Sequence, residues 1–173
     1  MNSAVILVGN IGSGKTTEAR KYVDMGFYSV DQDSIRTMLG SGKYIFDLKL
    51  EPIVKEVSSL LIKRLCEAKV NFVVDGALVN QELRKRIIDI VRPFTDYNIS
   101  AYVLPEIDRT TAIARRMFHD SRGYTAEEWG AVYDKFKAKT EPVNIDEDFD
   151  EILYHVAHNC ACIWRRRDYE KHD

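Results

Sequence analysis

Residues 9–17 have the types and spacing of a phosphate-binding loop. They read Gly-Asn-Ile-Gly-Ser-Gly-Lys-Thr-Thr and directly follow the apolar run of residues 4–8. Glycines let successive backbone N–H groups turn toward a polyphosphate, so such a loop forms an anion-binding nest at the start of a helix. Lys15 supplies a positive charge for the β- and γ-phosphates, and the Thr16 hydroxyl suits Mg²⁺. We therefore predict that ATP is bound by Gly12, Ser13, Gly14, Lys15, Thr16 and Thr17.

A second glycine-rich segment shows what the motif requires. Residues 40–43 repeat its last letters, Gly-Ser-Gly-Lys, but Tyr44 stands where Ser or Thr is needed. No apolar strand precedes this segment either, so it lacks the strand and helix that make a phosphate site. The sequence predicts a mobile loop after a helix.

A carboxylate and an arginine follow the second predicted strand. The strand covers residues 27–30, and Asp33 and Arg36 come soon after it. Asp33 or Ser34 can cap the helix that begins here, which explains one polar residue but not the combination. The carboxyl end of a strand beside the phosphate loop instead places a base and an anion-binding group near the γ-phosphate. We predict a catalytic role for Asp33, with Arg36 beside it in the substrate site.

Asp75 ends another apolar strand, residues 70–74. In nucleotide-binding domains an aspartate at this position approaches the magnesium ion or its waters. The alternative is a carboxylate that caps or orients the following loop. We predict that Thr16 and Asp75 form the metal site.

Arg122 is the candidate for a positive charge on the transferring phosphate. Gly123 beside it offers a hinge, and small kinases close an arginine-bearing lid over the phosphates to exclude water and stabilise developing charge. Arg115 and Arg116 are second choices for this role. Arg109 is interpreted as part of a solvated helix face.

Apolar periodicity predicts the elements that must position these residues. Helices are predicted over residues 15–24, 48–68, 80–91, 108–118 and 126–138, and further strands over 99–104 and 152–156. In helix 48–68 the apolar residues expected to face the core are Ile53, Val54, Val57, Leu60, Leu61 and Leu65. Thr125 and Glu128 have the spacing of a capping box. Strands that alternate with helices predict an α/β fold, a parallel sheet flanked by helices.

The composition suits one compact domain. The chain has 173 residues, 45% of them hydrophobic, and a formal charge of −2. This charge excludes general electrostatic attraction to nucleic acid, so a polyanion would need a local patch. Three cysteines, short apolar runs and the lack of a charged-then-apolar leader predict a cytoplasmic protein without membrane spans. We assign residues 1–156 to the domain, with the lid at about 115–127, and residues 157–173 to a basic C-terminal tail.

Histidines and cysteines gather near the end of the chain. They are His155, His158, Cys160 and Cys162. Their spacing is not that of a familiar zinc site, and a short apolar segment with cysteines is typical of core. Trp164 and the arginines after it could stack on a base or touch a nucleic-acid backbone, but solvated termini are the default.

Together these segments resemble the kinase domain of bacteriophage polynucleotide kinase and its relatives. The matching segments are residues 9–17, 30–36, 74–75 and 122–123. Residues 141–142 and 147–152 are similar to the segment that closes the kinase domain of eukaryotic polynucleotide kinase-phosphatases. The resemblance spans about residues 4–156 and implies the three-layer P-loop nucleoside triphosphate hydrolase fold of kinase type, with an Arg-bearing lid.

The resemblance also implies an activity, the ATP- and Mg²⁺-dependent transfer of phosphate to the 5′-hydroxyl of a polynucleotide. Asp33 would take the proton from that hydroxyl, and Arg36 would contact the phosphate on its 3′ side. Asp75 would lie near the metal and the base in the substrate site, and Arg122 would act on the transferring phosphoryl group. Gln32 departs from the pattern, because the phage enzyme has a basic residue there.

Two alternatives to this activity stay open. The same parts serve small kinases whose acceptor is a nucleoside, a sugar or another metabolite, and the sequence shows no acceptor pocket that decides between them. A nucleotide-binding switch or ATPase without an acceptor is the other alternative, although it has less use for Asp33 and Arg36. The sequence leaves the oligomeric state open.

Overall fold

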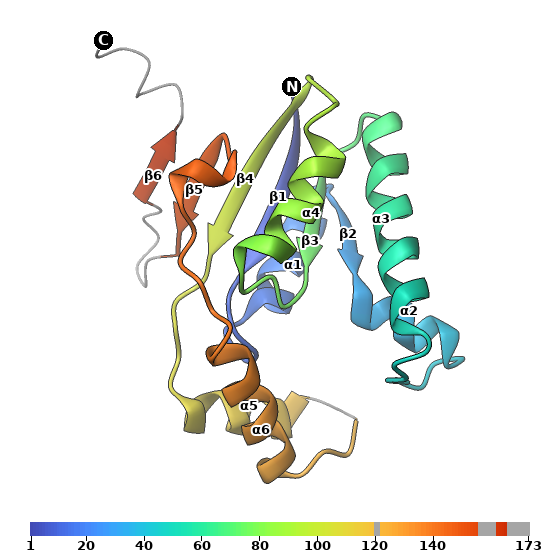
Figure 1. Ribbon diagram of the computed structural model, residues 1–173, viewed down its shortest axis with the longest axis vertical. Helices are drawn as coiled ribbons and strands as arrows, with labels where there is room; N and C mark the ends of the chain where they lie inside the picture. Colours follow the sequence, from blue (N-terminus) through green and yellow to red (C-terminus); the bar gives the residue numbers. More distant parts are fainter. Residues whose placement is uncertain (120–121, 156–161, 166–173) are drawn as a thin grey trace.

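The computed structural model describes residues 1–119, 122–155 and 162–165. The described part contains one six-stranded sheet in the order β2-β3-β1-β4-β5-β6 (Figure 1). The strands are β1 (Asn2–Val8), β2 (Tyr28–Asp31), β3 (Phe72–Asp75), β4 (Tyr97–Val103), β5 (Glu151–Tyr154) and β6 (Cys162–Arg165). The helices are α1 (Lys15–Asp24), α2 (Gln32–Leu39), α3 (Glu51–Glu67), α4 (Gln81–Val91), α5 (Arg109–His119), α6 (Ala126–Lys137) and the short 3-10 helix η1 (Ile145–Glu147).

Strands β1 to β5 are parallel, which confirms the predicted α/β sheet. Strand β6 runs antiparallel to β5. It lies within the predicted C-terminal tail, so residues 162–165 extend the sheet by one strand. The other residues of 157–173, with His158 and Cys160 among them, lie outside the described residues.

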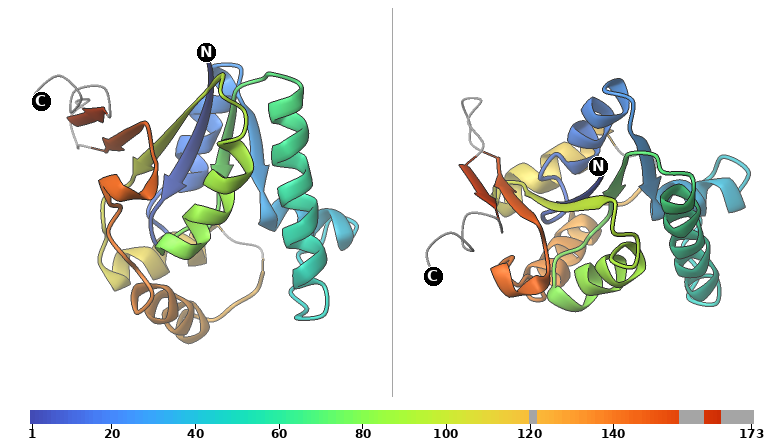
Figure 2. Two further views of the ribbon diagram at one scale, coloured as in Figure 1. Left: turned by 45° about the horizontal axis from the view of Figure 1, so that its top comes forward. Right: turned by 90° about the horizontal axis from the view of Figure 1, so that it is seen from above.

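Helices cover both faces of the sheet (Figure 2). On one face, Ala4, Ile6 and Val8 of β1 pack in a cluster with residues of α3 and α4. On the other, Val5 and Leu7 pack with Ala19 of α1. Because successive side chains of a strand point to opposite faces, a strand covered on both sides must be apolar throughout. This is why the segment before the phosphate loop reads as an unbroken apolar run.

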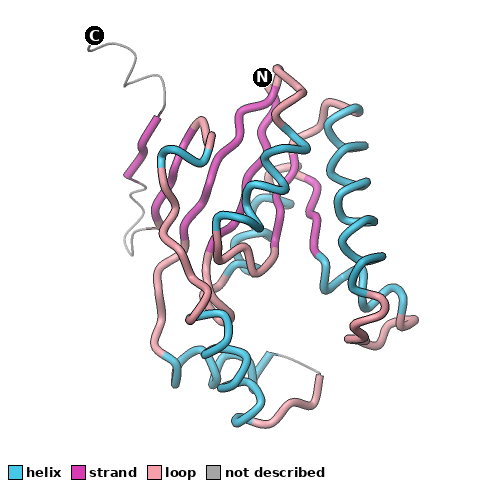
Figure 3. Tube along the Cα trace, in the orientation of Figure 1, coloured by secondary structure: helices cyan, strands magenta, loops and turns pink. Residues whose placement is uncertain are grey.

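Helices α5 and α6 pack together beyond the carboxyl ends of the strands, at the bottom of Figure 1 and Figure 3. They have their own cluster of buried side chains, made of Ile11, Ala112, Trp129 and Tyr133. Ile11 belongs to the phosphate loop, so this helical pair is joined to the loop through its core. The predicted capping box of Thr125 and Glu128 is present at the start of α6.

The prediction for the face of α3 was partly wrong. Its buried side chains are Val54, Ser58, Ile62 and Cys66. Of the residues expected in the core, Ile53, Leu60 and Leu61 are 46%, 52% and 39% exposed. The buried residues recur every four positions, so α3 buries one narrow stripe, and one small polar residue, Ser58, occupies part of that stripe. Apolar character alone therefore pointed to a broader face than the one that packs.

Candidate active site

The phosphate loop connects β1 to α1 and encloses the side chain of Lys15. The Lys15 ammonium donates hydrogen bonds to the carbonyl oxygens of Gly9, at 2.8 Å, and Asn10, at 2.7 Å. Gly12 and Gly14 have φ angles of 70° and 100°, the left-handed region that glycine adopts without strain. Burial removes the ammonium from water and lowers the pKa of Lys15 to about 8, with Arg116 acting in the same direction and Asp75 and Asp33 opposing it.

The loop is anchored to the helical pair α5 and α6. A Cβ added to Gly12 would lie 2.9 Å from Cα of Ala112, so the loop backbone approaches α5 as closely as only glycine allows. Arg115 donates a hydrogen bond of 3.0 Å to the carbonyl oxygen of Gly12. From α6, the carbonyl oxygen of Tyr133 accepts a bond of 3.3 Å from the side-chain amide of Asn10. The position of the helical pair and that of the loop are therefore linked.

The loop fits a bound polyphosphate and its metal. The Ser13 hydroxyl is buried and has no hydrogen-bond partner among the described residues, which leaves a donor for an anion. The Thr16 hydroxyl donates to Asp75, and together they offer the oxygen ligands that Mg²⁺ prefers. Burial raises the pKa of Asp75, while the bond from Thr16 and the charge of Lys15 oppose the rise.

Asp33 lies in the first turn of α2 and does not cap the helix. The sequence offered Asp33 or Ser34 as the cap, but Asp31 is the cap: its carboxylate accepts from the backbone N–H groups of both residues, at 2.9 and 3.0 Å. Asp31 has extended backbone angles, as the N-cap position requires. The carboxylate of Asp33 is 40% exposed and is available for other contacts.

Two arginines hold the Asp33 carboxylate. Arg36 donates a bond of 2.7 Å to Oδ1, and Arg122 donates one of 2.6 Å to Oδ2. The structure thus brings together Asp33, Arg36 and Arg122, which we predicted from the sequence to be site residues. Charge on Asp33 also acts on the buried Lys15, so this cluster and the phosphate loop share one electrostatic environment.

Glu51, which no sequence pattern indicated, pairs with two of the three nitrogens of the Arg36 guanidinium. Arg36 Nε and Nη2 donate to the two oxygens of Glu51 at 2.8 and 2.7 Å, a bidentate pair. Burial opposes the charge on Arg36, yet its bonds to Glu51 and Asp33 raise its pKa. The hydrogen bonds that Arg36 donates to Glu51 lower the pKa of Glu51. A capping or motif pattern could not reveal this pair, because Glu51 begins α3, beyond a loop.

Aromatic rings surround Arg122. Its Cζ atom lies 3.9 Å from the ring centroid of Tyr44 and 5.4 Å from that of Trp129. Of the second-choice arginines, Arg116 also faces Trp129, at 5.2 Å, while Arg115 contacts the phosphate loop as described above. Arg122 contacts the candidate base directly, through its hydrogen bond to Asp33.

Of the histidines and cysteines near the end of the chain, the structure describes the side-chain contact of His155. His155 pairs its Nδ1 with the Tyr102 hydroxyl at 2.8 Å. Within residues 1–119, 122–155 and 162–165 no three His, Cys, Asp or Glu side chains are grouped as metal ligands. In the same part of the chain, no helix is both long and apolar enough to cross a membrane.

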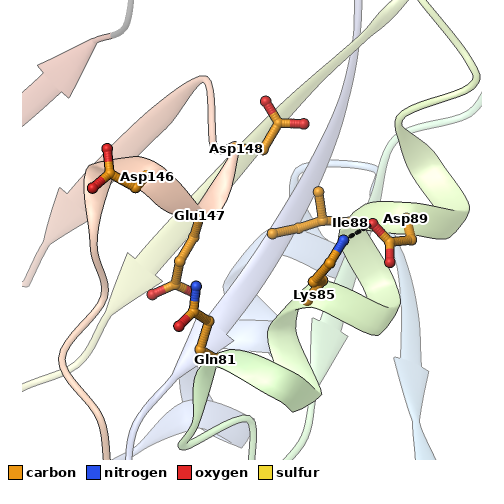
Figure 4. A pocket seen from close by; sticks show the side chains of 7 residues that line it. All are labelled: Gln81, Lys85, Ile88, Asp89, Asp146, Glu147 and Asp148. Carbon is orange, nitrogen blue, oxygen red and sulfur yellow. Dashed lines mark hydrogen bonds and ion pairs between the residues drawn. The ribbon is translucent and has the colours of Figure 1, made fainter.

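A small pocket lies between α4 and η1 (Figure 4). Its lining residues are Gln81, Lys85, Ile88, Asp89, Asp146, Glu147 and Asp148. None of them belongs to the phosphate loop or to α2. Beside the pocket, Arg84 is fully buried and forms a bidentate pair with Glu147, with bonds of 2.6 and 2.7 Å. The pocket thus adjoins a structural ion pair and is separate from the candidate active site.

The comparisons with known proteins agree with a P-loop fold of kinase type. The AAA domain family matches residues 5–142. No curated protein matches the sequence. A chain of the Pnkp1/Rnl/Hen1 RNA repair complex is 17% identical, with a TM-score of 0.62 over 81% of this chain and 46% of that chain.

Two further solved structures have a similar fold. A sugar kinase from Janibacter sp. HTCC2649 is 16% identical, with a TM-score of 0.62 over 89% of this chain and 86% of its own. Kti12 of Chaetomium thermophilum, in complex with ADP-AlF3, is 11% identical, with a TM-score of 0.65 over 91% and 90%. At these identities the likeness concerns the fold. The chain spans less than half of the matched chain in the RNA repair complexes, 38% and 46%.

Proposed function

The chain belongs to the AAA domain family, whose match covers residues 5–142, and from this premise we propose that it is an ATP-dependent phosphotransferase with a hydroxyl acceptor. One observation carries the proposal: the Asp33 carboxylate, beside the phosphate loop, is contacted by two arginines. A protein that only binds or hydrolyses a nucleotide has less use for a carboxylate and two arginines arranged in this way.

In this proposal some of the site residues bind ATP and Mg²⁺, and others act in the transfer of the phosphate. The loop amides and Lys15 bind the triphosphate, and Thr16 and Asp75 hold Mg²⁺. When bound, the metal neutralises charge on the phosphate oxygens. Asp33 takes the proton from the acceptor hydroxyl. The oxygen of that hydroxyl bonds to the γ-phosphorus as the bond between the γ-phosphorus and the ADP oxygen breaks. Arg122 stabilises the charge of the transferring group.

The 5′-hydroxyl of a polynucleotide is the acceptor we propose first. The segments that resemble polynucleotide kinases, and their order along the chain, support this acceptor. The fold shared with a chain of an RNA repair complex supports it as well. Arg36 would then contact the phosphate on the 3′ side of the accepting nucleotide, sharing its guanidinium with Glu51.

A small neutral acceptor is the second candidate, and one observation favours it. Glu51 and Asp33 already engage three nitrogens of Arg36, so this side of the site offers an acceptor phosphate little unpaired positive charge. The fold of the sugar kinase from Janibacter is compatible with such an acceptor.

Incubation with γ-labelled ATP, Mg²⁺ and parallel panels of 5′-hydroxyl DNA, 5′-hydroxyl RNA, nucleosides and sugars tests the proposal. Label on an oligonucleotide, with a rate that falls steeply as salt rises, supports the polynucleotide acceptor. Label on a nucleoside or sugar, with little salt dependence, supports the second candidate. Release of inorganic phosphate without a labelled acceptor would contradict both.

A further inference from the structure

Tyr44 is the aromatic residue in closest contact with the Arg122 guanidinium. The Cζ atom of Arg122 lies 3.9 Å from the centroid of the Tyr44 ring, against 5.4 Å for Trp129. The same guanidinium donates its 2.6 Å hydrogen bond to Asp33. The Arg122 guanidinium thus donates to the candidate base while its Cζ atom lies over the Tyr44 ring, so it makes both contacts at once.

The turn before Tyr44 ties the ring to the helix that carries Asp33. Backbone bonds join Gly42 to the carbonyl of Thr37, at 2.9 Å, and Lys43 to that of Gly40, at 3.1 Å. A Cβ on Gly40 would lie 1.9 Å from the carbonyl oxygen of Lys43, so the chain can turn this tightly only with glycine there. The segment expected to be a mobile loop is therefore hydrogen-bonded to the end of α2.

The base and the ring consequently belong to one hydrogen-bonded segment, α2 and the turn after it, whereas Arg122 comes from the segment between α5 and α6. An aromatic face attracts the guanidinium without carrying a negative charge. A carboxylate in place of Tyr44 would compete with the phosphate for Arg122. The ring therefore orients the cation and adds no negative charge beyond that of Asp33.

We propose that Tyr44 is a positioning residue for the phosphoryl transfer, which holds the Arg122 guanidinium beside Asp33 before the acceptor arrives. The inference rests on the proposed function and deepens it. It assigns a role to a residue that no motif includes. The ring, rather than the hydroxyl, carries this role.

Kinetics of Tyr44→Phe and Tyr44→Leu test the proposal with the acceptor that the labelling panel identifies. Tyr44→Phe keeps the ring, so kcat should stay within about 2-fold of the wild type, and Tyr44→Leu should lower kcat on the order of 10-fold with an unchanged KM for ATP. Tyr28→Leu is the matched control, because Tyr28 is exposed at the amino end of β2. A kcat of Tyr44→Leu equal to that of the control would overturn the proposal.

A double-mutant cycle separates positioning from a general structural effect. If Tyr44 acts through Arg122, Tyr44→Leu should have no further effect on kcat in an Arg122→Ala background. Full additivity of the two effects would overturn the proposal. If the wild type transfers phosphate to no acceptor, the proposed function fails and the inference with it, whereas an active wild type with an unaffected Tyr44→Leu overturns this inference alone.

Trp129 fluorescence tests the contact without any catalysis. The chain has two tryptophans, so a Trp164→Phe background leaves Trp129 as the reporter of the nearby guanidinium groups of Arg116 and Arg122, and Arg116 is the same in every variant. Tyr44→Leu and Arg122→Ala should change its emission in the same way, and Tyr44→Phe should leave it unchanged. Emission that responds to Arg122→Ala but not to Tyr44→Leu would show that the ring does not hold Arg122.

Discussion

Arg122 donates a 2.6 Å hydrogen bond to Asp33 from a position 89 residues further along the chain. The bond joins the two halves of the candidate site. One half is the first turn of α2, at the end of β2, and the other is the segment between α5 and α6. Because α5 and α6 also contact the phosphate loop, the nucleotide site, the base and the arginine form one connected arrangement.

Replacement of Arg122 tests the half of the site that comes from the helical pair. Arg122→Ala should lower kcat on the order of 10³-fold, because a cation near the transferring phosphoryl group stabilises the transition state. The KM for ATP should change little. Steady-state kinetics of Arg122→Ala and of the control Arg109→Ala measure both quantities. Arg109 is a suitable control because it is an arginine of α5 that pairs with Asp134 on the surface, at 3.0 Å. A rise in KM for ATP at constant kcat would count against a transition-state role.

The pKa of Lys15 predicts how ATP affinity depends on pH. Burial lowers this pKa to about 8 in the free protein, and a bound polyphosphate raises it again by its charge. Binding above pH 8 must therefore take up a proton, so affinity should fall as pH rises, by up to about tenfold per pH unit. Below pH 8 the ammonium is already formed and the dependence from this group disappears.

Titration calorimetry between pH 7 and 9.5, in two buffers of different ionisation heat, measures this uptake. Lys15→Arg serves as the comparison, because a guanidinium stays charged over the whole range. An ATP affinity of the wild type that is constant from pH 7 to 9.5 would contradict the prediction.

Asp75 should set the requirement for magnesium. Asp75→Asn removes the charge from the pair that it forms with the Thr16 hydroxyl, so half-maximal activity should need roughly 10- to 100-fold more Mg²⁺. ATP binding without metal should be kept. Mg²⁺ titrations of the wild type, Asp75→Asn and Asp96→Asn make the measurement, since Asp96 lies just before β4, at the opposite end of the sheet. An unchanged Mg²⁺ midpoint would show that Asp75 only orients the loop.

The buried pair of Arg84 and Glu147 should dominate the polar contribution to stability. Arg84→Met leaves the Glu147 carboxylate buried without its partner, which costs about 3–5 kcal/mol of unfolding free energy. Lys85→Met removes an exposed pair with Asp89 from the same helix, and its effect should be much smaller. Urea unfolding of both variants gives the comparison. Equal effects would mean that the arginine contributes no more than a surface charge.

Local sequence patterns predicted the elements and the residues at their ends. The phosphate loop lies between β1 and α1 as its motif requires, and Asp75 ends β3 next to Asp31 of β2 in the parallel register. Such positions follow from short segments because a parallel strand buried on both sides is apolar and its polar end stands out. The parallel sheet flanked by helices could therefore be predicted from these patterns, whereas β6 and the buried face of α3 could not.

Contacts between distant segments could not be predicted in this way. Glu51 begins a helix and Tyr44 follows a turn, and neither position has a local signal for its contact with an arginine. The choice of Asp31 as the cap depends on a backbone angle, because several neighbouring polar residues could cap equally well. These contacts depend on the tertiary arrangement, which the motif pattern does not contain.

The role of Asp33 is the central claim, and label transfer by Asp33→Asn tests it most directly. The variant keeps the size of the side chain but cannot take a proton from the acceptor. Transfer from γ-labelled ATP to the acceptor should fall on the order of 10²- to 10⁴-fold, while calorimetry shows ATP affinity close to that of the wild type. Transfer at the wild-type rate, with the same acceptor and the same ATP affinity, would contradict the assignment of Asp33 as the base.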